Sequence, residues 1–146
     1  MSRKDWLLLV IGAARGELLS PVQLQKSMFL LKEDQGDAVG QYFYEFVPYA
    51  YGPFCVDLYR DAEELEQEGL VSIHLNRSGR WREYRVTPEG RELAKNLRAQ
   101  ISDETASYIK KTVKMVRALS FHELVREIYE RFPDYRKHSV FQGMRE

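Results

Sequence analysis

Two dipeptides in which a hydroxyl residue directly precedes a proline constrain the fold of this chain more than any other feature. In Ser20-Pro21 and in Thr87-Pro88, the hydroxyl can accept a hydrogen bond from an N–H of the first helical turn. The proline then takes the first helical position, where its missing N–H leaves no hydrogen bond unmade. These signals predict one helix that begins at Pro21 and another that runs from Pro88 to about Ala99.

A mostly apolar segment precedes the first of these signals, and an apolar stripe follows it. Residues 3–14 are predicted to form a central helix. In the helix that follows, Leu24, Met28 and Leu31 recur at the i, i+4, i+7 spacing of one helical face. That helix is expected to end in the loop of residues 34–40.

Gly52-Pro53 repeats the helix-start pattern, so a third helix is predicted from there through Glu68. Gly69 stands where the left-handed C-terminal cap of that helix belongs. Two strands are predicted next, at residues 70–74 and 81–86, joined by a hairpin with turn-forming residues at its tip. The apolar face of the third helix is predicted to consist of Phe54, Leu58, Ala62 and Leu65.

The residues after 100 are predicted to add two helices. Ser102 fits the N-cap of a fifth helix, and Ser120 with Glu123 forms the capping box of a sixth, which ends at Phe132-Pro133. The fifth helix has an apolar stripe made of Ile109, Val113 and Val116. Appended helices with apolar stripes often supply a two-fold interface, so we expect a homodimer through this region unless the stripes only complete the core.

The order of these elements predicts the fold class. The chain is expected to be α+β and mainly helical, with the plan of a winged helix: three helices, a twisted hairpin and a further helix. Residues 1–146 are predicted to form a single domain, with a core at 3–100 and a helical extension at 101–146. The aromatic segment 42–51 is a strand-like insertion before the third helix. It is either a stacking or peptide-binding surface or, as we favour, a lid that packs alternate side chains against that helix.

Composition excludes several classes of protein. The chain has 146 residues, 22 basic and 22 acidic, so it lacks the overall positive charge of many nucleic-acid-binding proteins. Its longest apolar run, residues 6–14, is too short to span a bilayer and lacks a cleavage pattern after it. The only cysteine, Cys55, permits neither an internal disulfide nor a cysteine metal cluster and is expected to be buried. A cytoplasmic location is therefore expected.

No combination of residues in the sequence predicts catalysis or a bound cofactor. His74, His122 and His138 lie in three separate predicted elements, without the spacing that places two imidazoles on one helical face. A glycine-rich phosphate loop is absent from the sequence. We therefore expect a non-enzymatic protein without a metal or cofactor.

Charge is distributed unevenly along the chain. Residues 53–69 contain one basic and six acidic residues, whereas residues 70–100 contain seven basic and three acidic residues. The third helix would read bases in a DNA-binding winged helix, and its acidity disfavours that role because phosphates repel carboxylates. An acidic helix suits a basic protein partner, for which the candidate contacts are Asp57, Arg60, Asp61, Glu63, Glu64 and Glu66.

Basic residues elsewhere support a DNA-binding alternative. Arginines gather around Trp81 in the hairpin, and three cations of the fifth helix share one stripe. Such side chains can enter a minor groove or follow phosphates, or they can be a solvated, salt-bridged face. The candidate nucleic-acid contacts are Arg77, Arg80, Arg82, Arg85, Lys110, Lys114 and Arg117.

Several of these segments together resemble a known family. Leu24-Gln25-Lys26, residues 46–51, Gly52-Pro53 and a helix that ends at Glu68-Gly69-Leu70 resemble the Panacea antitoxin domain and related phage-associated proteins. The resemblance covers residues 4–132, and residues 86–90 resemble the exit from the wing in many winged-helix regulators. It implies a non-enzymatic module, in several members an antitoxin that neutralises a partner protein by direct contact. Lys26 is then either a partner contact or a solvated helix lysine.

Two functions follow as hypotheses. The first is an antitoxin-like protein-binding module whose partner is basic and toxin-like. The alternative is a DNA-binding transcriptional regulator that docks through its basic hairpin and fifth helix.

Overall fold

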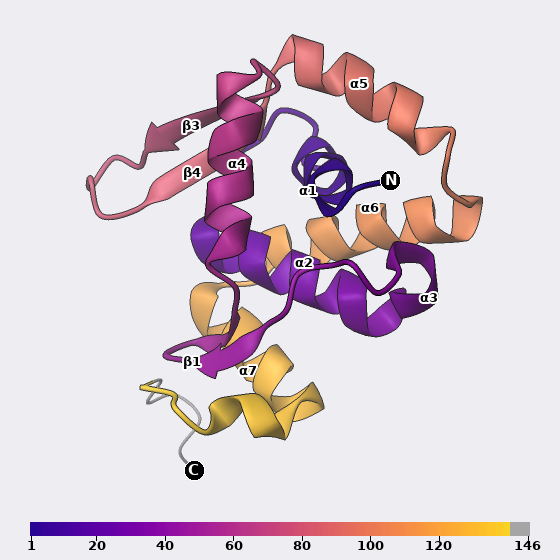
Figure 1. The fold of residues 1–146 in the computed structure, drawn as a ribbon. Helices are drawn as coiled ribbons and strands as arrows, with labels where there is room; N and C mark the ends of the chain where they lie inside the picture. Colours follow the sequence, from indigo (N-terminus) through magenta and orange to yellow (C-terminus); the bar gives the residue numbers. More distant parts are fainter. Residues whose placement is uncertain (141–146) are drawn as a thin grey trace.

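A computed structural model describes residues 1–140, which are mainly helical with two small antiparallel sheets (Figure 1). This confirms the predicted α+β class. The helices in this part of the chain are α1 (Arg3–Gly12), α2 (Pro21–Asp34), α3 (Gly36–Val39), α4 (Asp57–Gln67), α5 (Pro88–Arg98), α6 (Asp103–Ala118), α7 (Phe121–Arg131) and the 3₁₀ helix η1 (Pro133–Arg136). The strands pair as β1 (Val47–Tyr49) with β2 (Gly52–Phe54) and as β3 (Val71–Leu75) with β4 (Arg82–Val86).

Four of the predicted helix starts are confirmed by side-chain hydrogen bonds. The hydroxyls of Ser20, Thr87, Ser102 and Ser120 each accept from the backbone N–H three residues later, at 3.0–3.2 Å. Ser20 and Ser120 also form reciprocal capping boxes. Each such cap stabilises its helix by about 1 kcal/mol.

The predicted start of the third helix is wrong. Gly52-Pro53 lies in β2, where Pro53 is opposite Pro48, and α4 begins only at Asp57. Gly52 has a φ of 107° and no side-chain oxygen with which to cap a helix, so the dipeptide turns the chain back along β1 instead. Phe54 therefore packs its ring against Tyr49 and Tyr59 and does not lie on the apolar face of α4.

The end of the same helix is as predicted. Gly69 adopts a φ of 79°, and the N–H of Leu70 donates to the carbonyl of Leu65 at 2.9 Å, which closes the last turn. The strands β3 and β4 then form the predicted hairpin. An isolated bridge adds Leu19 to its edge, because Leu19 and Tyr84 exchange two backbone hydrogen bonds of 2.9 Å.

Helix α1 lies at the centre of the core, with α2, α4, α5 and α6 packed around it (Figure 1). Its side chains from Leu7 to Ile11 are buried. The stripe of α6 and the apolar side chains of α7 are buried in the same cluster. These stripes complete the core of the chain, so they no longer support the expected homodimer.

No helix within residues 1–140 is long and apolar enough to cross a membrane.

Candidate protein-binding interface

The N-terminal half of α4 is held by a partly buried ionic cluster. Asp61 is only 9% exposed. Its carboxylate accepts from the hydroxyl of Tyr44 at 2.6 Å and from Nε of Arg3 at 3.2 Å, while Arg3 also pairs with Asp57 at 3.4 Å. Burial, reinforced by the hydrogen bond to Asp61, raises the pKa of Tyr44. Asp61 therefore fixes the aromatic segment to α4 and is not placed to contact a partner.

The exposed carboxylates of α4 are also engaged within the chain. Lys4 pairs with Glu64 at 3.1 Å and with Glu68 at 2.9 Å. The hydrogen bond to Glu68, followed by that to Glu64, raises the pKa of Lys4. Arg82 of β4 pairs with Glu63 at 2.9 Å. Glu66 accepts from the backbone N–H of Ile73 at 3.2 Å, and Arg60 pairs with Asp57 at 3.6 Å. The acidic helix is therefore largely compensated by neighbouring cations.

The predicted nucleic-acid contacts are divided between separate environments. In the hairpin, Arg82 is occupied by Glu63, and Nη2 of Arg85 lies 3.4 Å from Nε2 of His74. Arg77 and Arg80 are exposed near the turn and form no ion pair with residues 1–140. On α6, Lys110 and Lys114 are exposed, whereas Arg117 pairs with Glu17 at 3.7 Å.

The Leu-Gln-Lys segment has a structural role that sequence reasoning missed. Oε1 of Gln25 accepts from the backbone N–H of Cys55 at 2.9 Å, and Nε2 of Gln25 donates to the carbonyl of Cys55 at 2.8 Å. These two hydrogen bonds fix the chain between β2 and α4. Lys26 is only 3% exposed, and its Nζ donates to the carbonyl of Pro53 at 3.4 Å. Burial lowers the pKa of Lys26 to about 7. Lys26 is thus neither a surface contact nor a solvated lysine, and Cys55 is buried as predicted.

The aromatic segment divides into an inner and an outer set. Phe43, Tyr44 and Phe46 are buried, as expected of a lid on the core. The expected alternation is wrong, because Phe43 and Tyr44 are consecutive and both face inward. Tyr42 and Tyr51 face outward, with 84% and 42% of their surface exposed. The segment therefore closes the core and also supplies surface aromatics.

A largely apolar hollow of about 540 Å³ lies between the start of α2, the β1–β2 turn, the β3–β4 loop at Trp81 and the start of α7. We call it the aromatic groove. Tyr51, Trp81 and Phe121 are exposed there by 42%, 43% and 43%, and the rings of Tyr51 and Phe121 meet edge to face at 5.1 Å. The remaining apolar lining includes Val22, Leu119 and Leu124. Exposed aromatic side chains around one hollow are typical of a protein-binding site.

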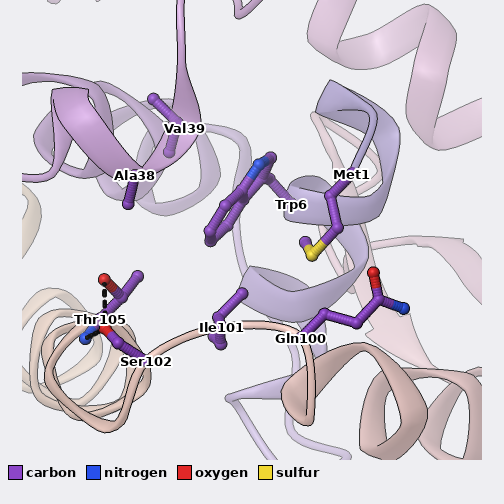
Figure 2. A pocket seen from close by; sticks show the side chains of 8 residues that line it. All are labelled: Met1, Trp6, Ala38, Val39, Gln100, Ile101, Ser102 and Thr105. Carbon is purple, nitrogen blue, oxygen red and sulfur yellow. Dashed lines mark hydrogen bonds between the residues drawn. The ribbon is translucent and has the colours of Figure 1, made fainter.

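Another hollow, of about 330 Å³, lies between α1, α3 and the loop that joins α5 to α6. Figure 2 shows the indole of Trp6 between Met1, Ile101 and the side chains of α3. None of the side chains that line it is charged. Its hydroxyls are already engaged, because Ser102 donates to Thr105, which donates to Gln35. These side chains offer packing surface and no reactive group.

Within residues 1–140, no group of three or more His, Cys, Asp or Glu side chains is placed to hold a metal ion. Comparison with known proteins adds no relative, because no family model and no curated protein matches the chain.

Proposed function

We propose that this chain is a non-enzymatic winged-helix module that binds another protein, with the aromatic groove as its main contact surface. The winged-helix assignment is supported by the order α1, Leu19, α2, α4, β3 and β4. In that order Leu19 acts as the short first strand, because it pairs with Tyr84 at the edge of the hairpin. The segment that contains α3, β1 and β2 is an insertion before α4.

One observation carries the proposal: Tyr51, Trp81 and Phe121 come from three separate elements and expose their rings around one hollow. Tyrosine and tryptophan are enriched among the residues that dominate binding energy, because they bury a large area while losing few rotamers. The groove is mainly apolar, so the matching partner surface is an apolar side chain or short apolar segment. Binding by direct contact is also how the resembled antitoxins act.

The acidic face of α4 is a secondary contact in this proposal. Lys4 and Arg82 already pair with Glu64 and Glu63, so this face attracts a basic partner less strongly than its sequence implied. Reversing these glutamates would break intramolecular ion pairs as well as any contact with a partner. Substitutions in the groove are therefore the cleaner test.

The experiment compares a Trp81→Ala, Phe121→Ala double variant with the wild type and with Tyr42→Ala. Tyr42 is a matched control, because it is an aromatic residue that is 84% exposed and does not line the groove. Proteins captured from host lysate by each variant after crosslinking are quantified by mass spectrometry. We expect a partner that the wild type and Tyr42→Ala retain and that the double variant loses. Equal capture by all three folded proteins would contradict the proposal.

DNA binding is a second candidate because Arg77 and Arg80 project near the hairpin turn without ion pairs to residues 1–140. Each phosphate contact that is lost lowers the slope of log affinity against log salt by about one. An Arg77→Ala, Arg80→Ala variant would therefore bind duplex DNA more weakly and with a flatter salt dependence. Sequence-selective binding by the wild type at physiological salt would favour this function over the first.

A further inference from the structure

A third hollow, of about 790 Å³, lies between α1, α5 and α6 and differs from the aromatic groove in its charge. We call it the basic groove. Its floor is apolar and includes Leu9, Ala13, Ala94, Ile101 and Ile109. Its cations, which come from the turn after α1 and from α5 and α6, are Arg15, Arg91, Lys95, Arg98 and Lys110.

Two of these cations lie at the turn that follows α1. Arg15 has a φ of 57° and is the one non-glycine residue in the left-handed region among residues 1–140. The guanidinium of Arg91 lies against Gly16, since a Cβ added to Gly16 would be 2.8 Å from Nη2 of Arg91. Neither arginine forms an ion pair with residues 1–140, so both charges are available at the mouth of the groove.

Lys95 and Arg98 form exposed ion pairs, and Arg98 also donates to the backbone carbonyl of Ile101 at 3.2 Å. Lys95 pairs with Glu92 at 3.9 Å, and both side chains are more than 70% exposed. Arg98 pairs with Asp103, whose side chain is 99% exposed. Exposed ion pairs of this kind contribute little free energy, so a partner carboxylate can replace these acids at small cost.

We propose that the basic groove binds an acidic amphipathic helix of a protein partner. The apolar floor would receive the apolar face of that helix, and the cations would meet carboxylates on its flanks. The floor includes the alanines Ala13 and Ala94, which permit close approach of a helix backbone. A nucleic acid would leave this floor uncovered, because its outer surface is made of phosphates and sugars. The eleven residues of α5 span about 16 Å, which matches a partner helix of about three turns.

This proposal does not depend on the aromatic groove, because none of Tyr51, Trp81 and Phe121 lines the basic groove. The Trp81→Ala, Phe121→Ala variant should therefore bind acidic helices as the wild type does. Loss of binding at the aromatic groove and loss of binding at the basic groove can therefore be distinguished with the same set of variants.

The test uses a panel of synthetic twelve-residue peptides with leucine and alanine on one helical face and glutamate on both flanks. Matched peptides carry lysine in place of glutamate, or the same residues in scrambled order. Binding to the full chain is measured by fluorescence anisotropy at two salt concentrations. The key variant is Arg91→Glu with Lys95→Glu. Its control, Lys111→Glu with Lys114→Glu, makes the same charge change at exposed positions of α6 that do not line the groove.

We expect the wild type and the α6 control to prefer the acidic amphipathic peptides. The Arg91→Glu, Lys95→Glu variant should lose about tenfold in affinity for them and gain affinity for the lysine peptides, since two ion pairs are exchanged for repulsions. Failure of the whole panel to bind the wild type would overturn the proposal. Equal binding of the scrambled and the acidic amphipathic peptides would also overturn it. So would a twenty-base-pair DNA duplex that binds more tightly than the acidic peptides and depends on Arg91 and Lys95.

Discussion

The buried Lys26 provides the sharpest prediction about stability. Its amine lies between α2, β2 and α7, where a Cβ added to Gly52 would be 3.4 Å from both Nζ of Lys26 and the ring of Tyr129. Its hydrogen-bond acceptor is the carbonyl of Pro53, and no carboxylate pairs with it in residues 1–140. Replacing it in Lys26→Met keeps the length and most of the volume of the side chain and removes the amine.

The magnitude follows from the pKa of Lys26, which falls from the ordinary 10.5 to about 7 on folding. Between these two values the unfolded chain binds more protons than the folded chain, so this lysine makes the protein more stable as the pH rises. The shift corresponds to about 4 kcal/mol of destabilisation at pH 7 and to less than about 1 kcal/mol at pH 10. Loss of the hydrogen bond to Pro53 offsets about 1 kcal/mol of the gain. Lys26→Met should therefore be more stable than the wild type by about 3 kcal/mol at pH 7.

The assay is urea unfolding of the wild type, Lys26→Met and Lys114→Met at pH 6.5, 8 and 9.5. Lys114 is a matched control, because it is an exposed lysine on a helix. Folding raises the pKa of several tyrosines, so their titration becomes important only near and above pH 10 and is shared by all three proteins. The advantage of Lys26→Met should shrink steadily as the pH rises. A wild type and Lys26→Met with parallel pH profiles would refute the reasoning, because they would show that the amine stays charged in the folded chain.

Three further substitutions test the elements that hold the candidate surfaces. Gly69→Val should cost roughly 1–2 kcal/mol of unfolding free energy, because a β-branched residue would occupy a φ of 79°. No atom lies within 4 Å of the added Cβ, so the cost comes from the backbone conformation alone. An unchanged melting temperature would show that the turn relaxes. Gly90→Ala should cost about 3 kcal/mol or prevent folding, because its Cβ would lie 1.9 Å from the carbonyl oxygen of Leu70; wild-type stability in urea would contradict that packing. Tyr44→Phe should cost about 2 kcal/mol in urea unfolding, because it removes the hydrogen bond to the buried carboxylate of Asp61, and a smaller loss than for an exposed Tyr42→Phe control would contradict the buried cluster.

Local signals were sufficient for most of the helices but not for the start of α4. Ser20 and Thr87 carry both a capping oxygen and a following proline, and each caps an N–H three residues later, so the signal is local. Gly52-Pro53 shares the proline but lacks the oxygen. The conformation of the chain after that dipeptide is held by Gln25, which forms two hydrogen bonds with the backbone of Cys55 from 30 positions away. No local pattern contains that contact.

The aromatic groove was harder to predict than the fold. Tyr51, Trp81 and Phe121 each belonged to a recognisable segment: an aromatic run, a hairpin and a capping box. Nothing in their spacing indicated that the three segments meet, because their proximity depends on how α7 packs beside the β1–β2 turn. An exposed aromatic residue at the edge of each segment was the available signal, and it becomes specific only once packing brings the three together.

The charges of the chain show most clearly why segments of sequence do not correspond to surfaces. The segment 53–69, with six acidic residues and one basic residue, meets Arg3, Lys4 and Arg82, so its field toward solvent is largely cancelled. Within residues 1–140, the acids that form ion pairs with the cations of α5 are Glu92 and Asp103, and both are exposed. The positive charge at the basic groove is therefore less compensated than the negative charge of α4. A partner steered by charge would approach that side of the molecule, although the sequence alone pointed to α4.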